Sequence, residues 1–150
     1  MKFTASLQRV LQLRRSLERQ EEMKLSRLAA RRQAITAAEA GNRAEARSEQ
    51  SALLRDLSSE VSGAELQLAG LRHEIEAERA VRLRLEAVQA ERAQLQQQLV
   101  LLHRTRERET LDTLEAHCRE AERRERLRRD QAALDEAFLL RRHDRQHEEG

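Results

Sequence analysis

The sequence predicts an all-α protein, folded as a long two-helix antiparallel coiled-coil hairpin. Three observations lead to this fold class. There is no proline among 150 residues, so nothing in the chain forces a helix to stop. The only aromatic residues are Phe3 and Phe138, which leaves little to fill a globular core. The rest of the composition is dominated by Leu, Ala, Arg, Glu and Gln, all strong helix formers.

The first helix is expected over residues 4–58, starting near Thr4, whose hydroxyl is suited to cap free backbone donors. Large apolar residues then follow at helical spacing. They are Leu7, Val10 or Leu11, Leu17, Leu25, Leu28, Ile35, and later Leu53, Leu54 and Leu57. Residues 36–52 contain alanine but no large apolar side chain. Gly41-Asn42 in this stretch is a turn candidate, but the preferred interpretation is a continuous, alanine-packed helix.

The turn is predicted at residues 58–63. Ser62 and Glu65 have the spacing of a capping box, in which each side chain accepts a backbone N–H of the other residue at a helix start. Gly70 is the alternative turn. It would make a symmetric hairpin in which Phe3 pairs with Phe138, whereas the turn near residue 60 makes the second helix overhang the first by about 25 residues.

The second helix is expected over residues 64–143. Within it Val81, Val88, Leu95 and Leu102 recur every seven residues, a spacing typical of a coiled-coil seam. The expected contact face comprises these residues with Leu68, Leu71, Ile75, Leu85 and Leu99, and further on Leu111, Leu114, Cys118, Ala121, Leu127, Leu134 and Phe138. The runs 99–102 and 137–140 are more apolar than one seam requires, which indicates either a partner surface or a locally thicker core.

The charge is unevenly distributed. Residues 1–35 contain nine Lys or Arg and three Glu, and residues 119–129 contain six Arg and three Glu. Arg123, Arg124 and their neighbours could meet an acidic surface or phosphates. Glutamates interrupt the cluster, however, and it has no aromatic residue for base stacking, so no nucleic-acid partner is expected.

No catalytic, cofactor or metal site is expected, and the protein is predicted not to be an enzyme. His143 and His147 lie one helical turn apart without further Cys or His ligands nearby. His117 and Cys118 are adjacent on a helix, so their side chains diverge. The single cysteine and apolar runs of at most four residues predict a cytoplasmic protein that does not insert into a membrane.

Both ends of the chain resemble one family. Residues 3–15 read FTASLQRVLQLRR, and residues 125–130 read ERLRRD, followed by Leu134-Asp135-Glu136 and Arg141. These segments resemble the two ends of the flagellar export protein FliJ family. The length, the absence of proline and the Ser/Gly break near residue 60 also suit that family.

The resemblance implies a cytoplasmic coiled-coil stalk that is not itself an enzyme. Such proteins enter the hexameric flagellar export ATPase and promote its assembly and activity. They also contact the cytoplasmic domain of the export gate, associate peripherally with the inner membrane through the export apparatus, and escort export chaperones. Carried over by position, the residues entering the ATPase ring would be Phe3, Leu7, Val10, Leu11, Arg123, Arg124, Leu127, Leu134 and Phe138. The alternatives are a stalk of a virulence-type secretion system and a structural coiled coil that self-associates.

Overall fold

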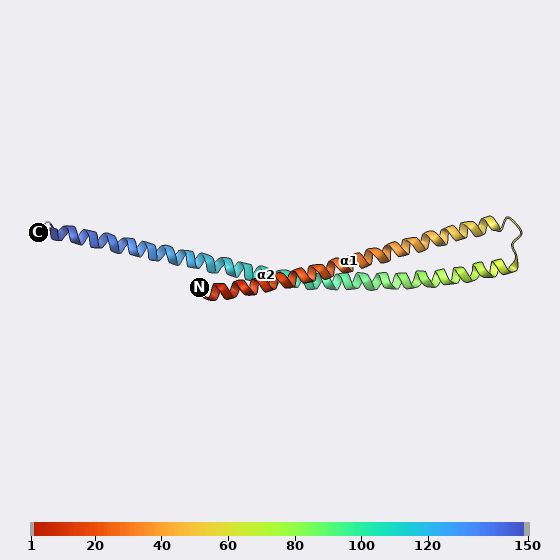
Figure 1. Ribbon diagram of the computed structural model, residues 1–150, viewed down its shortest axis with the longest axis horizontal. Helices are drawn as coiled ribbons and strands as arrows, with labels where there is room; N and C mark the ends of the chain where they lie inside the picture. Colours follow the sequence, from red (N-terminus) through yellow and green to blue (C-terminus); the bar gives the residue numbers. More distant parts are fainter. Residues whose placement is uncertain (1, 149–150) are drawn as a thin grey trace. The chain divides into compact units, whose positions relative to one another are not determined.

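The computed structural model describes the backbone of residues 2–148 and the side chains of residues 5–145. Two helices account for nearly all of it, α1 (Lys2–Asp56) and α2 (Gly63–Glu148), and the described residues form no strand. The helices are joined by one turn and pack antiparallel (Figure 1). The predicted all-α helical hairpin is therefore confirmed.

The turn occupies the residues between the two helices and contains the predicted capping box. The Ser62 backbone N–H donates to Glu65 Oε2 at 2.9 Å, and the Glu65 backbone N–H donates to Ser62 Oγ at 3.3 Å. At the other side of the turn the hydroxyls of Ser58 and Ser59 donate to the carbonyls of Arg55 and Asp56. Backbone groups left over at both helix ends are thus satisfied by serine and glutamate side chains.

Neither of the two alternative turns is formed. Gly41 and Asn42 lie inside α1, and Gly70 lies inside α2. None of the glycines in the described residues has a positive φ, so each takes an ordinary helical conformation. In the absence of proline, an isolated glycine lowers helix stability by only about 1 kcal/mol, which is too little to end a long helix.

The chain divides into two compact parts. The turn part comprises Glu18–His103, and the terminal part comprises Met1–Leu17 together with Arg104–Gly150. Each part contains a stretch of α1 lying beside a stretch of α2. In the turn part Arg32 reaches Gln94, and in the terminal part Arg14 reaches Glu107.

In the turn part, α1 packs through much of the predicted face. Ile35 is buried, and Leu25, Leu28 and Leu53 are half-buried, whereas Leu54 and Leu57 are exposed. The half-buried and buried residues of α2 recur at heptad spacing, but most are small or polar. Those in the two heptad columns are Ala69, Glu76, Ala80, Leu83, Ala87, Ala90, Gln94, Gln97 and Leu101, and Ala93 is half-buried beside them.

The predicted contact face of α2 in this part was wrong. Val81, Val88, Leu95 and Leu102 are all exposed, and so are Leu68, Leu71, Ile75, Leu85 and Leu99. The reason is that α2 has two faces with residues at heptad spacing. α1 packs on the face that contains Gln94 and Gln97, because its own polar groups form hydrogen bonds there. Gln97 Nε2 donates to the Glu21 backbone carbonyl at 3.2 Å and also to its carboxylate, and Arg32 donates to Gln94 at 3.2 Å.

Two polar residues of α1 are buried in this contact. Glu21 is stabilised there by Gln97 and by Lys24, whose Nζ lies 3.0 Å from its carboxylate. Asn42 is also buried, but its side-chain Oδ1 has no hydrogen-bond partner among the described residues. A buried asparagine at one seam position lowers stability but disfavours other helix registers, so Asn42 is a candidate residue for fixing how α1 and α2 align.

Near the turn, two carboxyl groups face each other across the hairpin. The hydrogen bond between Glu76 and Glu49, partial burial and the repulsion from Glu49 raise the pKa of Glu76 above 4.5. Because the folded state then binds a proton more tightly than the unfolded state, this contact loses stability as pH rises through the raised pKa. Above that pKa the two carboxylates repel each other.

Replacing Glu76 by glutamine is expected to raise the melting temperature at pH 7, because the repulsion with Glu49 disappears. The gain should shrink as pH falls and vanish below pH 4.5, where Glu76 is protonated in both the folded and unfolded states. Circular dichroism melts across this pH range measure the effect. Glu86→Gln, at an exposed position of the same helix, is the control. An equal gain at every pH would contradict the prediction.

In the terminal part, the buried residues of the contact between the helices are apolar. Leu7 and Leu11 of α1 are buried, and Leu111 and Cys118 of α2 are half-buried, as predicted, whereas Leu114 and Ala121 are exposed. Charged pairs border this small core. Arg14 lies 2.7 Å from Glu107 across the helices.

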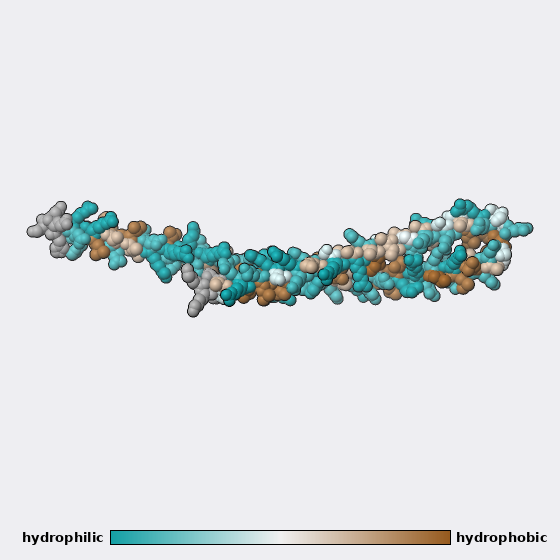
Figure 2. Space-filling view, in the orientation of Figure 1, coloured by the Kyte–Doolittle hydropathy of each residue, from teal (hydrophilic) through white to brown (hydrophobic). Residues whose placement is uncertain are grey.

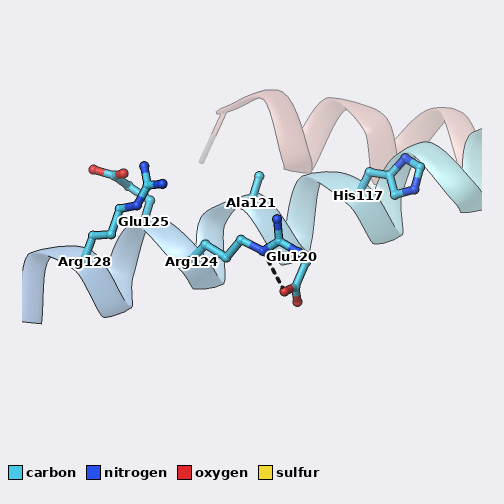
Figure 3. Close-up of a pocket in the computed structure, with 6 residues that line it drawn as sticks. All are labelled: His117, Glu120, Ala121, Arg124, Glu125 and Arg128. Carbon is cyan, nitrogen blue, oxygen red and sulfur yellow. Dashed lines mark hydrogen bonds and ion pairs between the residues drawn. The ribbon is translucent and has the colours of Figure 1, made fainter.

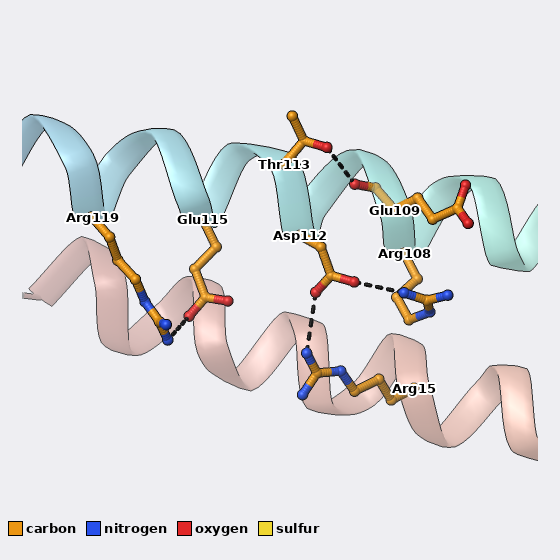
Figure 4. A network of polar contacts seen from close by, with 7 residues as sticks. All are labelled: Arg15, Arg108, Glu109, Asp112, Thr113, Glu115 and Arg119. Carbon is orange, nitrogen blue, oxygen red and sulfur yellow. Dashed lines mark hydrogen bonds and ion pairs between the residues drawn. The ribbon is translucent and has the colours of Figure 1, made fainter.

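A second charged contact in the terminal part centres on Asp112 (Figure 4). The Asp112 carboxylate accepts from Arg15 of α1 at 3.1 Å and from Arg108 of its own helix at 2.6 Å. Partial burial raises the pKa of Asp112, but the hydrogen bonds from Arg108 and Arg15 outweigh it, so its pKa lies below 3.8. This carboxylate therefore stays charged at neutral pH and ties α1 to α2.

Candidate partner-binding surface

Within the terminal part, α2 continues beyond the segment that packs on α1. Glu122 is the last half-buried residue, and every described side chain from 123 to 145 is exposed. Figure 1 shows this segment, in blue, extending past the start of α1. We call residues 123–145 the overhang. It agrees with the overhang expected from a turn near residue 60.

The overhang has apolar side chains that nothing in the described chain covers. Leu134 and Phe138 are each 66% exposed, and Leu127 is 59% exposed. Their spacing of seven and four residues places them on one helix face. Leu139 and Leu140 beside them are exposed as well. Figure 2 shows hydrophobic side chains, in brown, among hydrophilic ones, in teal, along this segment.

The arginines before this apolar face divide into paired and unpaired side chains. Arg123 and Arg124 both donate to Glu120, with Nε to carboxylate distances of 3.0 Å. These two hydrogen bonds lower the pKa of Glu120. Arg129 pairs with Glu125 at 3.1 Å. Such exposed pairs add little stability, so the arginines remain available to an acidic partner.

Arg126 and Arg128 have no acidic partner among the described residues, and they were not among the predicted site residues. Helical spacing does not indicate that they lack a partner. Glu125 lies three residues before Arg128, and Glu122 and Asp130 lie four residues from Arg126, but in the structure Glu125 pairs with Arg129 instead. The two side chains add free positive charge next to Leu127.

A shallow hollow lies at the start of the overhang (Figure 3). Its lining residues all come from one face of α2, namely His117, Glu120, Ala121, Arg124, Glu125 and Arg128. A hollow on a single helix cannot enclose a small molecule, since ligand sites bury most of the ligand surface. It is better suited to a side chain of a protein partner.

The predicted site residues fall into three groups. Leu127, Leu134, Phe138, Arg123 and Arg124 are exposed within the overhang. Leu7 and Leu11 are buried between α1 and α2, so they offer no surface to a partner, while Val10 is 42% exposed. The side chain of Phe3 lies outside the described residues.

Other candidate chemistry in the chain is not brought together. Cys118 is half-buried towards α1, whereas His117 lines the hollow. Side chains 5–145 include no group of three His, Cys, Asp or Glu placed to hold a metal ion, and His147 lies beyond them. Within the described residues, neither helix has a stretch apolar and long enough to span a bilayer.

No protein-family model matches the chain, and no curated protein or solved structure matches it.

Proposed function

We propose that this protein is a non-enzymatic coiled-coil stalk of the flagellar type III export apparatus, which inserts into the hexameric export ATPase and promotes its assembly and activity. The observation that supports this most is the overhang. It is a helix without a partner in the described chain, with an apolar face at Leu127, Leu134 and Phe138 next to the unpaired Arg126 and Arg128.

A lone helix gains little stability from its own hydrogen bonds, because most helix stability in proteins comes from packing. An exposed apolar face of this kind is typical of a segment that docks on another protein. The central opening of a hexameric ring suits a single helix, and the arginines would favour an acidic lining. The overhang would act by binding some subunit conformations more tightly than others, and so shift their populations.

The remaining roles follow from the resemblance to the FliJ family. They are contact with the cytoplasmic domain of the export gate, escort of export chaperones, and a cytoplasmic location beside the inner membrane. We propose Arg123, Arg124, Leu127, Leu134 and Phe138 as ring contacts. Leu7 and Leu11 contribute by holding α1 against α2.

The direct test is a titration of the flagellar export ATPase from the same organism with the purified full-length chain. ATP hydrolysis and hexamer formation are measured together. Saturable stimulation accompanied by more hexamer is the expected result. If the chain is helical by circular dichroism and changes neither quantity, the proposal is wrong. Stimulation of a virulence-type export ATPase instead would identify the alternative secretion system.

A further inference from the structure

The turn part has an apolar surface that the proposed function does not use. It lies on α2 and consists of Leu71, Val81, Leu85, Val88, Leu95, Leu99 and Leu102, all exposed. We call these residues the outer stripe. By contrast, the only apolar residues buried in the turn part are Ile35 and Ala90. Seven large apolar side chains of α2 are thus exposed on this face, whereas Ile35 is the one large apolar side chain fully buried in the turn part.

The outer stripe cannot be covered by α1 of the same hairpin. Each face of α2 consists of two columns of residues that repeat every seven positions. The face towards α1 is centred between the columns of Ala80 and Leu83, and the outer stripe is centred between the columns of Val81 and Leu85. At about 100° per residue, the centres of the two faces are separated by about 150° around the helix axis. Brown side chains are visible at the surface of this part of α2 in Figure 2.

The spacing of the outer stripe indicates that its occupant is a helix. Val81, Val88, Leu95 and Leu102 form one heptad column, and Leu71, Leu85 and Leu99 form the second column four residues on. Two such columns make the seam of a coiled coil, where side chains of one helix insert between those of another. Ala77, Glu78, Val81 and Arg82 line a shallow hollow on this face, which can receive such a side chain.

The charges in and beside the stripe favour a second copy in the antiparallel direction. Glu78 and Arg92 occupy the second column between the leucines. A parallel pair of copies in register would place Arg92 on Arg92 and Glu78 on Glu78, which is unfavourable. An antiparallel pair with Leu85 beside Val88 of the second copy avoids both clashes, and it also brings Leu71 level with Leu102.

The same antiparallel alignment matches two charges that flank the stripe. Arg84 and Glu91 each stand one residue before a position of the second column. Residues at such positions border the seam of a coiled coil and form ion pairs with the other helix. The alignment sets Arg84 of each copy opposite Glu91 of the other. Arg84 has no acidic partner among the described residues, and Glu91 is 53% exposed with Arg32 at 3.5 Å.

We propose that the outer stripe binds the outer stripe of a second copy, antiparallel, to form a symmetric dimer of hairpins. Because the same surface is used on both copies, the interface closes on itself and stops at two chains. This inference does not depend on the proposed function, since the stripe belongs to the turn part and the overhang to the terminal part.

Sedimentation equilibrium of the full-length chain from micromolar to near-millimolar concentration tests the proposal. A monomer–dimer equilibrium is expected, and Leu85→Glu should weaken it at least about tenfold because a charge enters the seam centre. Met23→Glu is the control, at a 56% exposed position of α1 against 59% for Leu85. A monomer at every concentration, or a dimer that Leu85→Glu leaves unchanged, would overturn the proposal.

Charge reversal tests the alignment. Arg84→Glu and Glu91→Arg are each expected to weaken the dimer, and the double variant should restore it, because the opposite charges meet again with their signs exchanged. Glu91→Arg also removes the contact with Arg32, but an exposed pair of this length adds little stability. Failure of the double variant to recover dimerisation would rule out the proposed alignment.

Discussion

Replacing Leu134 and Phe138 by glutamate is expected to abolish stimulation of the export ATPase. Both side chains are 66% exposed and lie on one face of the overhang. Central apolar residues of an interface often contribute 2 kcal/mol or more, so each replacement should weaken binding by roughly 30-fold. Neither residue packs within the hairpin, and helical content measured by circular dichroism should therefore not change.

Leu99→Glu is the matched control for this experiment. Leu99 is 67% exposed, about as much as Leu134 and Phe138, but it belongs to the outer stripe. It is expected to weaken the dimer and to leave ATPase stimulation intact. The variant with glutamate at Leu134 and Phe138 is expected to lose ATPase stimulation and to keep the dimer. If the overhang variant still stimulates the ATPase at wild-type concentration, the ring contact lies elsewhere on the chain.

Replacing Leu11 by alanine is expected to lower the free energy of unfolding by about 2–4 kcal/mol. Leu11 is only 2% exposed, which makes it the most buried residue of the small apolar core in the terminal part. The loss combines the transfer energy of the removed methyl groups with the cavity that remains. Because the two-helix contact buries few large side chains, this loss is a large share of the total stability.

Urea unfolding followed by circular dichroism measures this loss as a lower midpoint with an unchanged slope. Leu13→Ala is the control, two residues away and 58% exposed. It should change stability by no more than about 0.5 kcal/mol. Similar losses for the two variants would mean that α1 does not pack through Leu11.

The ion pairs of Glu120 show which features of the candidate surface can be predicted from local sequence. Its pairing with Arg123 and Arg124 is expected from acid–base spacings of three and four residues on a helix. The same rule also offers Glu125 to Arg128, three residues on, but in the structure Glu125 pairs with Arg129 instead. By contrast, local spacing does not indicate that Leu7 and Leu11 are buried rather than available for binding. That depends on contact between α1 and a distant segment of α2.

The sequence alone determined the helices, the turn and the overhang. The absence of proline permits two long helices, and Ser62 with Glu65 terminates the turn through hydrogen bonds between near neighbours. With the turn located, the unequal helix lengths follow. These features depend on interactions along the chain, which composition and spacing describe well.

Only the packed structure showed which face of α2 meets α1. Both the Val81 column and the Ala80 column repeat every seven residues, and hydrophobic spacing favours the first. In the hairpin the second is used, because α1 presents Glu21 and Arg32, which find Gln97 and Gln94 there. Spacing identifies a face that is able to pack, but the partner for that face is chosen by groups distant in sequence.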